Sequence, residues 1–158
     1  MNVEDAIRAL VDAGVEFVIV GGWSAVLNGG MQCTGDLDIC YARNPGNSSR
    51  LARVLAPVHP RLRDLPAGPP LVLDETTLQN SSFIRLNTDL GEIGLITEIA
   101  GLGTFEEMAP GSVATEAFGR LIRTLDLKSL IKAKRAAGRK RDLLELSELE
   151  SLLEAEEP

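Results

Sequence analysis

Cysteine, histidine and long apolar runs are scarce in this sequence, and each scarcity excludes a class of protein. The 158 residues include two cysteines, Cys33 and Cys40, which are too few for a disulfide framework and match no zinc-binding spacing. We therefore expect both thiols to be reduced and to act as packing residues. The single histidine, His59, lies in a proline-rich segment and is expected to be an ordinary surface residue. No apolar run approaches the roughly 20 residues of a membrane span, so no membrane partner is expected.

An excess of positive charge is also lacking. The formal net charge is −7, which disfavours a general affinity for nucleic acid because counterion release needs a basic surface, although a local basic patch can still exist. With 44% hydrophobic and 25% charged residues, the composition is typical of a globular protein. Residues 1–5 are acidic and lack the features of a signal peptide, so a cytoplasmic location is expected. The length predicts a single domain spanning 1–158.

Hydrophobic periodicity and the glycine and proline breaks predict helices and strands along the whole chain. Helices are expected at 3–13, 23–28 and 48–56, and two more form a C-terminal helical part at about 126–155. Strands are expected at 15–20, 36–41, 82–87, 92–99 and 120–125, with a short strand considered at 71–73. Residues 57–70 are expected to form an extended surface loop. In a compact sheet, the strand at 92–99 lies beside the strand at 36–41.

Two glycines and two aspartates form the motif around which the chain is organised. Gly21 and Gly22 follow an apolar strand, and Asp36 and Asp38 open the next strand. Because alternate residues of a strand point to the same face, both carboxylates are expected in one small volume. Two carboxylates so close together need a cation, and Mg²⁺ binds such oxygens together with substrate phosphates. A helix that starts just after the glycines offers free N–H groups to an anion.

This arrangement of a Gly-Gly turn and Asp-x-Asp on a strand–helix–strand frame resembles the nucleotidyltransferase superfamily of polymerase-beta type. Asn47 and the segments 101–106 and 130–139 are similar to the small bacterial AbiEii-like and minimal nucleotidyltransferase-like proteins. The resemblance covers most of the chain. It implies an α+β nucleotidyltransferase fold, in which a mixed central β-sheet is flanked by helices and followed by C-terminal helices.

The resemblance also implies roles for these residues. Gly21 and Gly22 become the turn that holds the nucleotide phosphates, and Asp36 and Asp38 become the catalytic ligands of Mg²⁺ (or Mn²⁺). The implied reaction transfers a nucleoside monophosphate from an NTP to an RNA or protein acceptor, in the setting of a toxin–antitoxin or defence system with a cognate antitoxin or toxin partner. Such transfer depends on charge neutralisation and positioning more than on an acid or base of unusual pKa.

Three positions depart from the family pattern. The place of the usual third carboxylate, which helps to hold the ion that activates the attacking hydroxyl, is taken by Gly94. Glu92 lies two residues earlier on the same strand face, about 7 Å away, and is either a catalytic substitute or a solvent-facing residue; Glu98 is a weaker candidate. Gln32 stands where relatives often have arginine, and Arg141 stands where lysine is common.

Several further candidates keep two interpretations each. Ser24 is either a helix cap or a phosphate contact, and Thr34 either stabilises the loop or contacts the nucleotide. Lys134 is the basic residue that we expect to bind the triphosphate. It belongs to a basic cluster, which is either a solvated helix face or a phosphate clamp. The cluster comprises Lys128, Lys132, Lys134, Arg135, Arg139, Lys140 and Arg141.

The sequence is compatible with three functions. The first is a Mg²⁺-dependent nucleotidyltransferase. The second is a binding module of the same fold with weakened or lost catalysis, which Gly94 and Gln32 favour. The third is a purely structural interaction protein, since a fold does not by itself fix a function.

Overall fold

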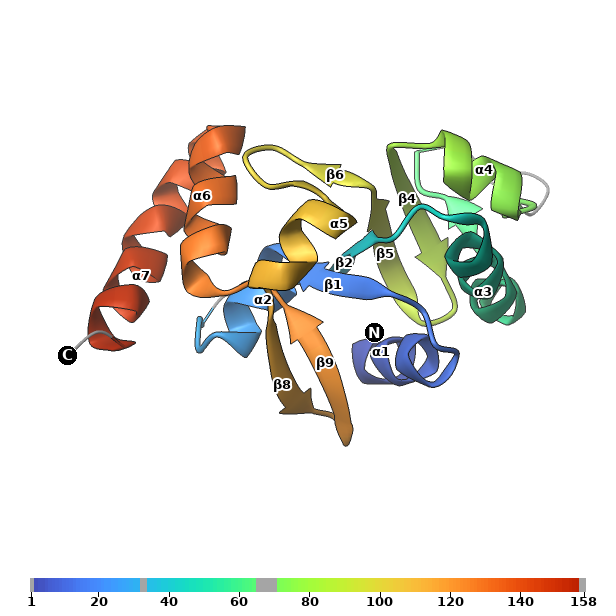
Figure 1. Cartoon of the computed structure of the whole chain (residues 1–158), viewed down its shortest axis with the longest axis horizontal. Coiled ribbons are helices and arrows are strands. Elements are labelled where there is room, and N and C mark those ends of the chain that lie inside the picture. Colours follow the sequence, from blue (N-terminus) through green and yellow to red (C-terminus); the bar gives the residue numbers. More distant parts are fainter. Residues whose placement is uncertain (1, 32–33, 65–70, 157–158) are drawn as a thin grey trace.

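The computed structural model of the chain describes residues 2–31, 34–64 and 71–156, so the expectations for Gln32 and Cys33 lie outside the described residues. Its centre is a mixed sheet of seven strands in the order β3-β4-β5-β2-β1-β9-β8 (Figure 1). The strands are β1 (Phe17–Val20), β2 (Asp36–Tyr41), β3 (Arg61–Leu62), β4 (Phe83–Thr88), β5 (Gly91–Ile96), β8 (Val113–Ala117) and β9 (Arg120–Thr124). A separate pair consists of β6 (Glu98–Ile99) and β7 (Gly103–Thr104).

Helices flank this sheet, as the sequence predicted. They are α1 (Val3–Asp12), α2 (Gly21–Leu27), α3 (Pro45–Leu55), α4 (Glu75–Asn80), α5 (Phe105–Met108), α6 (Leu127–Ala137) and α7 (Lys140–Glu156), with short 3₁₀ turns η1 (Ala56–Val58) and η2 (Ala109–Gly111). In Figure 1, α6 and α7 form a pair at one end of the molecule and α3 and α4 lie near the other. No helix within the described residues is both long enough and apolar enough to cross a membrane.

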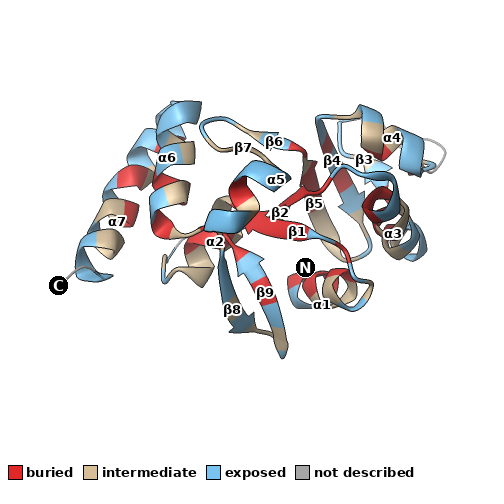
Figure 2. Ribbon diagram, viewed as in Figure 1, coloured by how far each residue is buried: buried red, intermediate tan, exposed pale blue. Residues whose placement is uncertain are grey.

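Alternation along the strands divides the apolar residues between two cores. On one face, Leu37 and Ile39 of β2 pack with α1, α3 and α4. On the other face, Val18, Val20 and Cys40 pack with α6 and α7. Figure 2 shows the buried positions concentrated in the central strands. Because the residues of β2 alternate between faces, this second face also carries Asp36 and Asp38.

A buried asparagine of α3 ties the entry of β1 to the exit of β2. The side-chain amide of Asn47 donates to the carbonyl oxygens of Glu16, at 3.0 Å, and Ala42, at 2.7 Å. Its Oδ1 accepts from the Glu16 backbone N–H at 2.7 Å. Asn47 is fully buried, so these bonds satisfy a polar group that would otherwise be costly in the core.

The helix boundaries differ from the expected ones in two places. The second helix begins at Gly21 rather than Trp23, because Gly21 accepts a positive φ of 65° directly at the end of β1. The third helix begins at Pro45 rather than Ser48. Asn44 caps it by accepting from the Asn47 backbone N–H, and Pro45 stands in the first turn, where its missing N–H has no cost.

Several predicted elements need correction. Residues 71–73, all of them described, form no strand, and the strand beside β4 at that edge of the sheet is β3. The segment 57–70 is not wholly a loop, since it contains β3. The strand expected at 92–99 is divided into β5 and β6. The elements β7, β8, α4 and α5 were not predicted from the sequence.

The predicted packing role of Cys40 is confirmed, because its thiol is free and fully buried. Burial raises the pKa of this thiol to about 12, so it stays protonated at neutral pH.

Candidate functional site

A pocket of about 360 Å³ opens over the part of the sheet where β2 begins. Its walls come from three parts of the chain: the ends of β1, β2, β4 and β5, the residue Arg63 just after β3, and the facing sides of α6 and the start of α7. The predicted residues Gly21, Asp36, Asp38 and Glu92 all line it, as does Lys134. The fold therefore brings together residues that lie more than a hundred positions apart in the sequence.

The register of the strands arranges the floor of the pocket in rows. Asp38 is paired with Val20 on one side and with Gly94 on the other, and Gly94 is paired in turn with Arg85. The strand of Glu92 therefore lies beside the strand of Asp36, as predicted. Gly94 leaves the place next to Asp38 without a side chain, and Arg85 follows it in the same row.

Asp38 is partly buried and lies beside a second carboxylate, Asp36. Burial raises the pKa of its carboxyl, and the neighbouring Asp36 raises the pKa further, while Arg85, Arg141 and Lys134 oppose the shift. A carboxylate that is disfavoured by desolvation and by a second carboxylate gains most from a cation bound between them.

Glu92 and Asp36 form the next row of the sheet, directly opposite each other in the parallel pairing of β2 and β5. A hydrogen bond with the Asp36 side chain raises the pKa of Glu92, and burial and the charge of Asp36 act in the same direction. Arg63 lies against both groups. Its Nη1 is 3.4 Å from Asp36 Oδ2 and 3.5 Å from Glu92 Oε2.

Glycine is needed at both positions of the Gly-Gly turn. A β-carbon on Gly21 would lie 2.9 Å from Asp38 Oδ2, and one on Gly22 would lie 2.7 Å from Thr34 Oγ1. Thr34 Oγ1 in turn donates to the Asp36 carbonyl oxygen at 3.2 Å. The turn after β1 and the start of β2 therefore pack directly on each other, and Thr34 stands in the stabilising position that one of its two interpretations foresaw.

Ser24 lies just after the turn and is not among the residues that line the pocket. It is fully buried, its hydroxyl donates to the Leu125 carbonyl oxygen at 3.3 Å, and it accepts from the Thr124 hydroxyl at 2.7 Å. These contacts join α2 to the end of β9. They give Ser24 a structural task in the described fold.

Lys134 reaches the pocket wall but is engaged by two carboxylates of α7. Its Nζ contacts Asp142 Oδ1 at 3.3 Å and also contacts Glu145. Asp142 accepts a second ion pair from Arg139 Nε, at 2.6 Å. Burial alone would raise the pKa of the Asp142 carboxyl, but hydrogen bonds from Arg139 and Lys134 outweigh it and lower that pKa.

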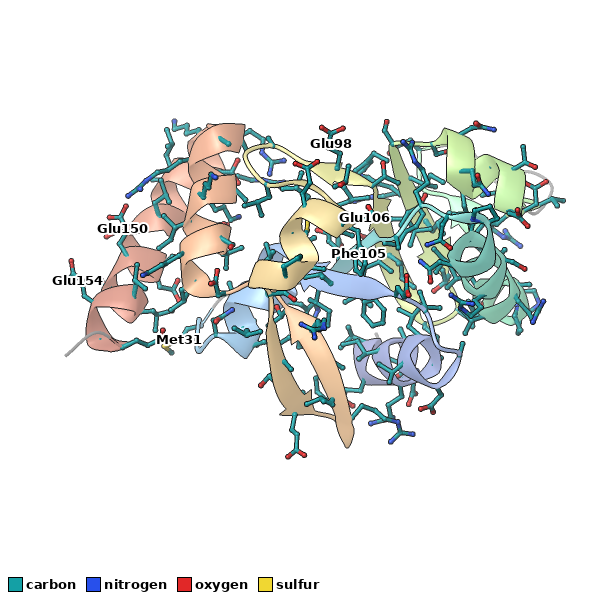
Figure 3. All side chains as sticks on the ribbon, in the orientation of Figure 1. Met31, Glu98, Phe105, Glu106, Glu150 and Glu154 are labelled. Atoms are coloured by element: carbon teal, nitrogen blue, oxygen red, sulfur yellow. The ribbon has the colours of Figure 1, made fainter. Side chains whose placement is uncertain are left out.

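The basic cluster of the sequence is therefore split. Lys134, Arg139 and Arg141 line the pocket, whereas Arg135 forms an ion pair at 2.6 Å with Glu150 of α7. Figure 3 shows Glu150 on the outer side of α7 and Glu98 on β6. Glu98, the weaker candidate of the sequence, is exposed and lines the pocket.

Among the lining residues that the sequence did not single out, Arg63, Phe83 and Arg85 carry side chains suited to binding a ligand. Arg63 was hidden in a proline-rich segment. The signal for the other two was present, because the alternation of 82–87 places Phe83 and Arg85 on the face opposite to the buried Ile84 and Leu86. The Arg85 guanidinium lies 5.1 Å from the centre of the Phe83 ring, a cation–π distance.

The acidic side chains of the pocket offer few ligands to a metal ion. Among the described residues, no group of three or more histidine, cysteine, aspartate or glutamate side chains is placed to hold one. Asp36 and Asp38 nevertheless fit a single Mg²⁺, since this ion commonly takes one or two carboxylates and completes its octahedron with phosphate oxygens and water. The two carboxylates point into the same pocket, so such ligands have room to enter.

Comparisons with known proteins find similarity among solved structures. No protein-family model matches the chain, and no curated protein matches it. Among solved structures it is similar to the lincosamide antibiotic adenylyltransferase LnuA in its lincomycin-bound form, with a TM-score of 0.62 and 14% identity over 96% of each chain. It is also similar to TM1012 from Thermotoga maritima, a candidate nucleotidyltransferase, with a TM-score of 0.58 and 16% identity over 94% of each chain.

The chain has the nucleotidyltransferase fold. This confirms the predicted α+β class with its mixed central sheet, flanking helices and C-terminal helical pair. At these identities the likeness concerns the fold, and the AbiEii-like subtype stays a prediction. In the nucleotidyltransferase fold of this chain, the pocket occupies the part of the sheet face that α6 and α7 leave open beside β2.

Proposed function

We propose that this protein is a Mg²⁺-dependent nucleotidyltransferase that transfers a nucleoside monophosphate from an NTP to an acceptor hydroxyl. The observation that carries the proposal is the position of Asp36 and Asp38 on one face of β2, in a pocket whose opposite wall holds Arg139 and Arg141. Carboxylates for a metal and guanidinium groups for phosphates are the two requirements of this chemistry.

Each part of the pocket has a task in this proposal. Asp36 and Asp38 hold the metal, and the bare backbone of Gly21 leaves Asp38 free to turn toward it. A bound Mg²⁺ supplies charge neutralisation on the triphosphate. Arg141 binds and orients phosphate oxygens from the α7 side, because guanidinium donors match their geometry. Arg139 gives its Nε and Nη2 donors to Asp142, so it contributes through Nη1.

The acceptor and the nucleobase need the apolar part of the pocket. Phe83, Ile96 and Ile99 line this part, and Phe83 is exposed enough to stack on a planar ring. RNA and protein hydroxyls are acceptor classes that follow from the family resemblance, together with a toxin–antitoxin or defence setting. The antibiotic named for LnuA adds a third class, a small-molecule hydroxyl.

Label transfer tests the proposal directly. The chain is incubated with α-labelled NTPs, Mg²⁺ or Mn²⁺, and RNA, protein and small-molecule acceptors, beside the variants Asp36→Asn and Asp38→Asn. We expect each aspartate variant to transfer label at least a hundredfold more slowly than the wild-type chain. Glu116→Gln, which removes an exposed carboxylate of β8, should transfer label at the wild-type rate. Equal transfer by wild type and both aspartate variants would sink the proposal.

A second candidate is a nucleotide-binding module without turnover. Gly94 favours it, because no side chain stands next to Asp38 where the family has its third carboxylate. Calorimetry separates the two functions: tight NTP binding that needs Asp36 and Asp38, without label transfer to any acceptor class, supports the module.

A further inference from the structure

Arg63 holds a position in the site that its backbone fixes. The Arg63 backbone N–H donates to the Arg85 carbonyl oxygen at 3.0 Å, which extends the pairing of β3 with β4 by one residue. In this place the side chain leans toward β5 and β2, and Nη1 lies between Asp36 Oδ2 and Glu92 Oε2, at 3.4 Å and 3.5 Å. The guanidinium thus bridges two carboxylates from two neighbouring strands.

Three carboxylates meet in this pocket, and they are not equivalent. Asp36 and Glu92 are register neighbours that share Arg63, whereas Asp38 makes no ion pair within the described residues. Among the described cations that line the pocket, Arg63 is the one that forms ion pairs with any of these three carboxylates, whereas Arg85, Arg141 and Lys134 act on Asp38 through their charge alone. The geometry thus offers one open cation position, at Asp36 and Asp38, and one position that the protein fills itself.

We propose that Arg63 is a resident cation that takes the place of a second metal ion, so that this site binds a single divalent ion. The inference rests on the proposed function, because it concerns the same carboxylates. Gly94 supports it from the other side: a β-carbon there would lie 2.2 Å from Asp38 Oδ1, so the sheet provides no further ligand beside Asp38.

An arginine suits this role because its guanidinium stays charged at every physiological pH and bonds two carboxylates at once. The contact is also reversible. The side chains of Arg63, Asp36 and Glu92 are 35%, 40% and 39% exposed, so water screens the pair and its contribution is modest. Arg63 therefore competes with a second ion.

Titration with Mn²⁺ alone tests the inference on the full chain, by calorimetry and by the electron paramagnetic resonance signal of free Mn²⁺. The variant is Arg63→Gln. Its matched control is Arg61→Gln, which removes the same charge from the same face of β3, two residues earlier, where the register neighbour is Asn87. Arg63→Lys retains the charge and serves as a second variant.

We expect the wild-type chain, Arg61→Gln and Arg63→Lys to bind one Mn²⁺ each. Arg63→Gln binds a second ion or binds the first about fivefold more tightly. Two ions bound by the wild type, or identical titrations for Arg63→Gln and Arg61→Gln, overturn the inference. If Asp36→Asn and Asp38→Asn abolish Mn²⁺ binding while Arg63→Gln changes nothing, only the role of Arg63 fails. If Mn²⁺ binding is insensitive to both aspartates, the proposed function fails with it.

Discussion

Gly94 lies directly opposite Asp38 in the parallel pairing of β2 and β5, and a β-carbon on Gly94 would stand 2.2 Å from Asp38 Oδ1. Asp38 Oδ1 is the end of a short side chain that can rotate. The fold can therefore accommodate a methyl group at position 94, but the Asp38 carboxylate must then move. We predict that Gly94→Ala lowers the free energy of unfolding by less than about 1 kcal/mol yet weakens Mn²⁺ binding about tenfold. Chemical denaturation and calorimetry measure the two effects. Gly111→Ala, where nothing lies within 4 Å, is the control, and unchanged Mn²⁺ affinity in Gly94→Ala would contradict this geometry.

Gly21→Ala combines two penalties. The residue has φ of +65°, which costs an alanine about 1–2 kcal/mol, and its β-carbon would lie 2.9 Å from Asp38 Oδ2. We predict a loss of stability of that size together with weaker Mn²⁺ binding. Gly119→Ala is the matched control, since Gly119 has φ of +75° with open space around it and should lose stability without losing Mn²⁺ affinity. Equal Mn²⁺ affinity in the two variants would show that Gly21 does not limit Asp38.

Asp142 is a buried carboxylate with two cationic partners, so Asp142→Asn leaves Lys134 and Arg139 without their shared counter-charge. We predict a loss of about 3 kcal/mol in the free energy of unfolding at pH 7. The pKa of Asp142 is lowered in the fold, so its contribution is complete above its ordinary value of 3.8 and is lost as the pH falls through the folded value.

Urea denaturation from pH 7 to pH 2 therefore shows a smaller acid loss for Asp142→Asn than for the wild type, and the two curves approach each other at low pH. A constant gap between the curves over this range would mean that the charge of Asp142 is not what stabilises the α6–α7 pair.

Phe83 tests the apolar part of the pocket. Its side chain is 47% exposed, so its truncation changes stability little, but a ring that stacks on it loses its partner. We predict that Phe83→Ala weakens NTP or acceptor binding about tenfold, seen in the calorimetric Kd or in KM, while Mn²⁺ affinity is unchanged. Leu121→Ala is the control, because Leu121 is 66% exposed on β9 and lies outside the residues that line the pocket. Equal Kd and KM values for the two variants would exclude a stacking role.

The sequence predicts the carboxylates well because their placement depends on local periodicity. Alternation in 36–41 is enough to place Asp36 and Asp38 on one face and Leu37 and Ile39 on the other, and the structure agrees. The glycine turn is likewise a local feature. Its outcome, a helix starting at Gly21 itself, differs from the prediction by two residues.

The parts that sequence could not predict depend on contacts between distant segments. Lys134 was chosen for the triphosphate, and only the packing of α6 on α7 brings it against Asp142 and Glu145. Arg63 could not be recognised as a site residue for the same reason. Its backbone pairs with residue 85 of a distant strand, and no local sequence pattern predicts that pairing. Leu73 illustrates the opposite error: an apolar run predicted a strand, whereas Leu73 is buried against the core without one.

The amide of Asn47 has a consequence beyond satisfying its own hydrogen bonds. Side chains alternate along a strand, so a slip of one residue between β1 and β2 would turn Asp36 and Asp38 toward α1 and α3 and expose Leu37 to the pocket. By holding Glu16 and Ala42 at fixed positions, Asn47 excludes that slip. A neutral side chain on the far side of the sheet thereby selects the face on which the protein displays its negative charge.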